Sequence, residues 1–82
     1  MAEMVHAFKH DVTGKDGRRY RARAFGEEEG HIWKAWLEFT PTDGGATLRT
    51  DSETSQPDRD AIVYWASGIE QVYLEGALSR AR

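Results

Sequence analysis

The chain has 82 residues, contains no cysteine and carries a formal net charge of −3. This length suits a single domain, residues 1–82, and is too short for two hydrophobic cores. Without cysteine, disulfide bonds and thiolate metal sites are excluded, so the fold must rest on packing. No apolar run reaches membrane-spanning length and the N-terminus lacks an export signal, which predicts a cytoplasmic protein with no membrane contact.

Four short segments have the character of β-strands. Clusters of turn residues, each about five residues long and containing glycine, separate them, which is typical of hairpin connections. The sequence therefore predicts an antiparallel meander of four strands. The predicted strands are residues 4–12, 18–25, 31–40 and 46–51.

One long C-terminal helix is predicted after these strands, from near Pro57 to about Leu78. Ser55 and Asp58 have the spacing of a capping box, and proline suits the first helical turn. One side of this helix carries apolar residues at helical spacing and should pack on the sheet. These residues are Ile62, Trp65, Ala66, Ile69, Val72 and Tyr73. The predicted fold class is α+β, a four-stranded antiparallel meander with one long helix packed across one face.

Arginines alternate with small or aromatic residues in the second predicted strand. Because successive side chains of a strand point to opposite faces, Tyr20, Ala22 and Ala24 should face the helix while the arginines share the other face. The same alternation in the third strand places Lys34 and Trp36 with the arginines. We expect Arg49 of the fourth strand to join them. The candidate site residues are thus Arg19, Arg21, Arg23, Lys34, Trp36 and Arg49.

Surfaces that bind single-stranded nucleic acid combine cationic and aromatic side chains. Arginine contacts the phosphates, and bases stack on the aromatic ring. Two other interpretations stay open. The arginines could only keep one face of the sheet solvated, with one of them over Trp36 in a cation–π contact. Alternatively, arginine and tryptophan could form the contact surface of a protein-interaction domain. The net acidity of the chain argues against tight non-specific coating of DNA.

Four antiparallel strands followed by a C-terminal helix is also the element order of the Whirly and positive-cofactor transcription proteins. The chain resembles these families in element order alone, so no binding residue is carried over from them. The resemblance implies binding of single-stranded DNA by an oligomer.

A second apolar stripe lies away from the predicted core side of the helix. It would be buried if two helices met across a twofold axis, which predicts a homodimer. The residues of this predicted dimer interface are Val63, Tyr64, Leu74, Ala77 and Leu78.

Metal binding and catalysis have little support in the sequence. His6 and His10 are four residues apart, which in a strand is roughly 13 Å and too far to share one ion. Carboxylates gather around the start of the helix, where they could hold a hard cation such as Mg²⁺, but the helix dipole and loop hydrogen bonds account for them better. These residues are Asp51, Glu53, Asp58 and Asp60. No nucleophile motif, phosphate loop or calcium loop is present. We therefore expect a non-enzymatic protein with no catalytic residue, no metal and no cofactor.

Overall fold

One antiparallel sheet dominates the computed structural model, which describes residues 1–82. Its strands are β1 (Glu3–Ala7), β2 (Val12–Thr13), β3 (Arg19–Glu29), β4 (Ile32–Pro41), β5 (Leu48–Arg49) and β6 (Thr54–Gln56). The two short strands β1 and β2 both pair with β3, and β5 and β6 both pair with β4. The predicted antiparallel meander is therefore confirmed, with each outer strand divided in two. The pairing of β6 with β4 was missed by the sequence prediction, which assigned residues 52–56 to the approach to the helix.

The β3–β4 hairpin is longer than predicted. Its pairing runs from Tyr20 opposite Pro41 to Glu29 opposite Ile32, so only Gly30 and His31 remain for the turn. Gly30 has a φ of 66°, a backbone conformation that favours glycine. The predicted connection at residues 26–30 was wrong because Gly26 lies in the strand, buried opposite Ala35. A Cβ at Gly26 would lie 3.4 Å from Ile62 Cγ2, so glycine here permits close packing against the helical layer.

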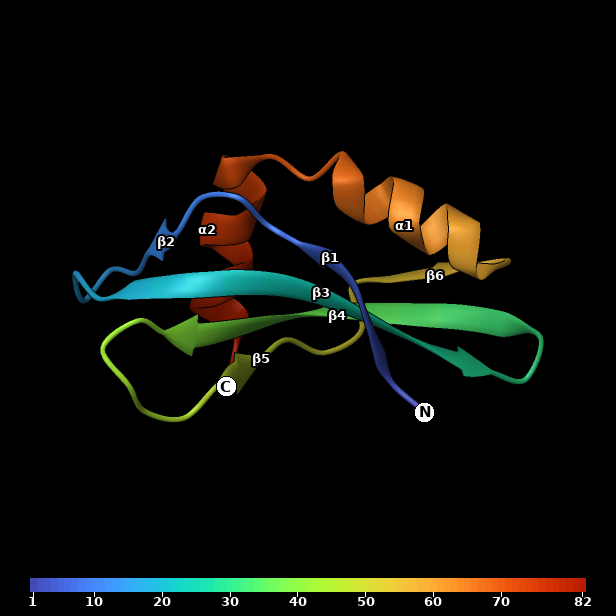
Figure 1. Cartoon of the computed structure of the whole chain (residues 1–82), viewed down its shortest axis with the longest axis horizontal. Coiled ribbons are helices and arrows are strands. Elements are labelled where there is room, and N and C mark those ends of the chain that lie inside the picture. The colour runs from blue at the N-terminus through green and yellow to red at the C-terminus, as the bar shows by residue number, and fades with distance from the viewer.

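Two helices, α1 (Arg59–Ser67) and α2 (Gln71–Arg80), cover the same side of the sheet (Figure 1). The predicted α+β fold with C-terminal helical structure across one face is thus confirmed. Asp58 is the N-cap of α1, and its side chain accepts a hydrogen bond from the Ala61 amide at 2.9 Å. Such a cap stabilises a helix by about 1 kcal/mol. The helix ends at Gly68, so the single long helix of the prediction is two helices joined at residues 68–70. Neither helix is long and apolar enough to cross a membrane.

The break at Gly68 changes which side of α2 meets the sheet. Leu74, Ala77 and Leu78 are buried in the core, where the prediction placed them in a dimer interface. Conversely, Val72 is exposed although it was predicted in the core. A break resets the helical phase, so the periodicity read through residues 57–78 could not continue into α2. Of the predicted interface, only Tyr64 is exposed, while Val63 is half-buried.

The core lies between the helices and one face of the sheet. Tyr20, Ala22 and Ala24 of β3 are buried there, as the alternation predicts, together with Leu37 and Phe39 of β4. The small alanine side chains leave room for the helices to approach the sheet. The opposite face carries no helix and is called the open face below (Figure 1).

Candidate anion-binding face

The arginine row of β3 lies on the open face. Arg21 is opposite Thr40 of β4, and Arg23 is opposite Glu38, which is itself opposite Arg49 of β5. Because the pairing register is continuous, every candidate site residue predicted from the alternation lies on this one face. Those residues are Arg19, Arg21, Arg23, Lys34, Trp36 and Arg49.

Trp36 lies on the expected face but is not free to stack on a ligand. Only 4% of its surface is exposed. The Phe25 ring lies parallel to it at 6.4 Å between centroids, and the Arg49 guanidinium sits 4.0 Å from its ring centroid. Its Nε1 donates a hydrogen bond to Glu38 at 3.0 Å. The expectation of an exposed aromatic platform was therefore wrong, because neighbouring strands cover the ring with Phe25 and Arg49.

The cations of the open face differ in whether the chain neutralises them. Arg19 pairs with Asp11 at 3.3 Å and Lys34 pairs with Glu29 at 3.2 Å. No carboxylate oxygen lies within 4.0 Å of the guanidinium nitrogens of Arg21, Arg23 or Arg49. We call these three side chains the guanidinium cluster. Although Glu38 lies between Arg23 and Arg49 in register, its carboxylate accepts from Trp36 instead.

Arg23 has donors that the chain does not use. One terminal nitrogen donates to Thr40 Oγ1 at 3.0 Å, while the Nε atom is buried and has no hydrogen-bond partner. A buried donor left unpaired costs about 1–3 kcal/mol. Thr40 also shares a hydrogen bond of 2.9 Å with Thr47. The two hydroxyl groups were missed by the sequence prediction, although the position of Thr40 opposite Arg21 follows once the register is known.

A small hollow of about 260 Å³ lies beside the cluster, lined by Arg21, Thr40, Pro41 and Thr42. Arginine offers donors in a planar fork, and threonine hydroxyls can donate as well, so this region suits an oxyanion. The chemistry available here is recognition by charge and hydrogen bonding.

The other end of the open face is acidic. Glu27 and Glu29 lie near the β3–β4 turn, where Glu27 pairs with the N-terminal amine at 3.2 Å. The face therefore has a positive end at the guanidinium cluster and a negative end at the hairpin tip. A polyanion would be confined to the positive end because the glutamates repel it.

The acidic residues near the helix start are accounted for within the chain. Glu53, whose side chain is 9% exposed, accepts from Tyr73 Oη at 2.5 Å and from Arg80 at 2.6 Å. Burial, together with the Glu53 hydrogen bond, raises the pKa of Tyr73 above its ordinary value. This contact ties the β5–β6 connection to α2. No group of three or more His, Asp or Glu side chains is placed to hold a metal ion, and the His6 ring packs edge-on against Phe8 at 4.7 Å.

Comparisons of the chain with protein-family models, with curated proteins and with solved structures find no match.

Proposed function

We propose that this chain is a small non-enzymatic module that binds single-stranded nucleic acid through its phosphates on the open face. The observation that carries the proposal is the guanidinium cluster, three arginines on one face with no carboxylate partner. Arg23 lies over the Phe25 ring at 5.5 Å and Arg49 over the Trp36 ring at 4.0 Å, contacts that engage the face of a guanidinium and leave N–H donors in its plane for phosphate. Such a module would act in the cytoplasm.

The residues of the open face fit contacts to the phosphates of a nucleic acid, with little contribution from base stacking. Arg21 and Arg23 are two residues apart on β3, so their side chains leave the sheet about 7 Å apart along the strand. They form a short line of donors, and Arg49 extends it across to β5. A flat sheet face with no protruding helix suits a single strand better than the groove of a duplex. Because Trp36 is covered, we expect little discrimination between base sequences.

Binding should depend strongly on salt. We expect a fluorescent 12-mer of thymidine to bind at about 50 mM salt and to bind roughly 20-fold more weakly at about 200 mM, because three phosphate contacts give a logarithmic salt slope near −2. Fluorescence anisotropy measures both constants. Arg21→Gln should weaken binding and reduce the magnitude of the slope by about 0.7.

Arg59→Gln is the matched control, because it removes the same charge from α1 on the other side of the sheet, where Arg59 pairs with Glu3. Equal weakening by Arg21→Gln and Arg59→Gln would show that only net charge matters and would reject the proposed face. An absence of binding at about 50 mM salt would reject the nucleic-acid function. If an acidic peptide binds with salt dependence and the oligonucleotide does not, the open face is a protein-recognition surface and not a nucleic-acid site.

Self-association is a second candidate function, favoured by an apolar groove of about 490 Å³ at the junction of α1 and α2. Trp65, Ile69 and Tyr73 line it, and it also includes Tyr64 and Val72, which are 82% and 72% exposed. Large exposed apolar side chains around a hollow are typical of contact surfaces. A homodimer through this groove would replace the predicted interface, most of which is buried.

Sedimentation tests the homodimer. We expect the wild-type chain to sediment as a dimer and Val72→Asp to sediment as a folded monomer, since this side chain is exposed. The melting temperature of the variant should fall only by the stabilisation that association gave. A monomeric mass for the wild-type chain at high concentration would contradict self-association through the groove.

A further inference from the structure

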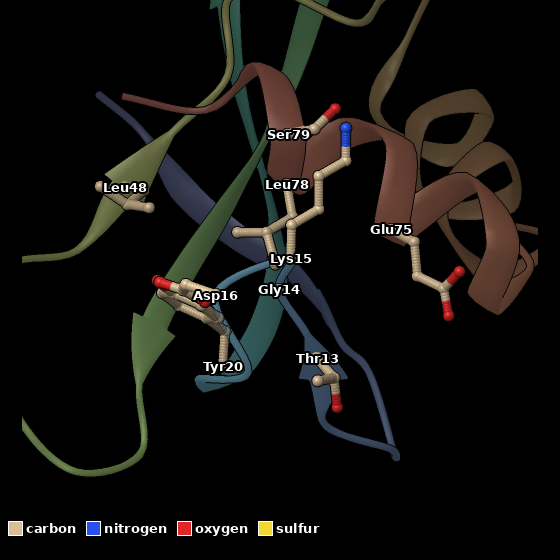
Figure 2. A pocket seen from close by; sticks show the side chains of 9 residues that line it. All are labelled: Thr13, Gly14, Lys15, Asp16, Tyr20, Leu48, Glu75, Leu78 and Ser79. Atoms are coloured by element: carbon tan, nitrogen blue, oxygen red, sulfur yellow. The ribbon is translucent and has the colours of Figure 1, made fainter.

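A cleft of about 500 Å³ lies on the helix side of the sheet, away from the open face. It runs between the β2–β3 turn and the C-terminal half of α2, with β5 at one end (Figure 2). This volume falls in the range of small-molecule sites in proteins. The guanidinium cluster takes no part in it.

The floor of the cleft is apolar. Tyr20, Leu48 and Leu78 supply it from β3, β5 and α2. Gly14 lets the turn approach this floor, because a Cβ there would lie 3.2 Å from the Tyr20 ring and 3.5 Å from Leu78. Arg18 donates to Asp43 at 3.1 Å and to the Gly44 carbonyl at 3.0 Å, which ties the residue following the turn to the β4–β5 connection. The cleft is thus built from segments that are held in place.

The charged side chains that line the cleft differ in whether they are hydrogen-bonded within the chain and in the direction in which they point. Asp16 accepts a hydrogen bond from the Arg18 amide at 3.0 Å and so belongs to the turn. Figure 2 shows Glu75 pointing away from Tyr20 and Leu48, whereas Lys15 extends alongside α2 toward Ser79. The Lys15 ammonium has no carboxylate within 4.0 Å. The one cation of the cleft is therefore available above an apolar floor.

Tyr20 contributes its ring to the cleft. Its side chain is almost wholly buried and forms part of the apolar lining. In Figure 2 the ring lies on the opposite side of the cleft from the Lys15 ammonium. Lys15 is therefore the group that the cleft offers to an anionic ligand.

We propose that this cleft binds a small amphiphilic monocarboxylate. The ligand has an aliphatic or aromatic body that covers Tyr20, Leu48 and Leu78, and a carboxylate that accepts from the Lys15 ammonium. Two carboxylates also line the cleft, but Asp16 is hydrogen-bonded within the turn and Glu75 points away from Tyr20 and Leu48. Close to Lys15 a ligand carboxylate is therefore favoured over an ammonium group, which would meet a like charge.

Titration of the ¹⁵N-labelled chain with octanoate, octan-1-ol and octylamine tests the site. We expect octanoate to give saturable amide shifts at residues 13–16, Leu48 and Leu78, and to bind at least fivefold more tightly than octylamine. Lys15→Gln should weaken octanoate about fivefold and leave octan-1-ol unchanged. Tyr20→Phe, which keeps the ring and removes only the hydroxyl, should leave the binding of both compounds unchanged.

Lys9→Gln is the control, since Lys9 is an exposed lysine in the connection between β1 and β2 and does not line the cleft. Octanoate shifts that fail to saturate, or that centre on the α1–α2 groove, would overturn the site. Equal binding of octanoate and octylamine would overturn the assignment of Lys15 as the ligand's partner. The spectrum of each variant without ligand reports whether it is folded.

Discussion

Leu74→Glu should unfold the chain. Leu74 is 1% exposed and lies in the main core cluster with residues of β2, β3 and β4. An uncompensated carboxylate at such a position costs several kcal/mol, whereas a chain of this length has a free energy of unfolding of about 4–12 kcal/mol. Far-UV circular dichroism should show loss of the cooperative thermal transition, or a melting temperature lowered by tens of degrees.

The same substitution would have a different result if the helical segment were one continuous helix. Leu74 would then belong to an exposed stripe, and glutamate there would separate two copies without unfolding either. Tyr64→Glu is the matched control because Tyr64 is 82% exposed on α1. It should shift the melting temperature by only a few degrees. A cooperative transition near the wild-type temperature for Leu74→Glu would show that the phase of α2 is wrongly assigned.

Trp36→Ala should greatly lower the stability of the chain. We do not expect it to act by removing a ring on which a ligand stacks. Removal of a buried tryptophan costs about 3–5 kcal/mol, and for a domain of this size 1 kcal/mol lowers the melting temperature by about 4–8 °C. We therefore expect a loss of at least about 12 °C. The variant removes the ring that Phe25 and Arg49 cover and the donor that Glu38 accepts from.

Trp36→Phe separates the two roles that Trp36 could have. It keeps an aromatic ring beside Phe25 and removes the hydrogen bond to Glu38, so we expect a smaller loss of stability, about 1 kcal/mol from that bond plus a contribution from reduced volume. Bases would not stack on a covered ring, so any loss of oligonucleotide affinity in the folded variant should come from the released Glu38 carboxylate turning to Arg23 or Arg49. Glu38→Gln in the Trp36→Phe background should then restore the affinity. A wild-type melting temperature for Trp36→Ala, with a large loss of oligonucleotide affinity, would instead make Trp36 an exposed platform.

The sequence predicted which residues of the sheet face the helices and which face away. In a strand, successive side chains must point to opposite faces, so few assignments are possible. In β3 the arginines alternate with Tyr20, Ala22 and Ala24, and only one assignment puts the small apolar side chains under the helices. The helix could be predicted only in part. Gly68 weakens a helix but does not by itself end one, so the break and the resulting phase of α2 depend on packing against the sheet.

The sequence predicted which face of the sheet carries the candidate site residues. It could not predict whether Trp36 is exposed there or whether Arg23 has a carboxylate partner. Whether Trp36 is open or covered depends on Arg49, which reaches it from another strand through the pairing of β4 with β5. Whether Arg23 is neutralised depends on where the Glu38 carboxylate points, and it accepts from Trp36. Both outcomes follow from register and rotamer, which alternation alone does not determine.

The cleft and the guanidinium cluster are built on the same two strands. Tyr20 is followed along β3 by Arg21, and Leu48 is followed along β5 by Arg49, so each strand carries neighbouring residues to opposite sides of one thin wall. Because one backbone segment carries both side chains, a change in the position of either strand would move the lining of the cleft and the guanidinium cluster together. Substitutions of Tyr20 or Leu48 made to probe the cleft therefore call for a parallel measurement of oligonucleotide binding, and substitutions of Arg21 or Arg49 call for a parallel measurement at the cleft.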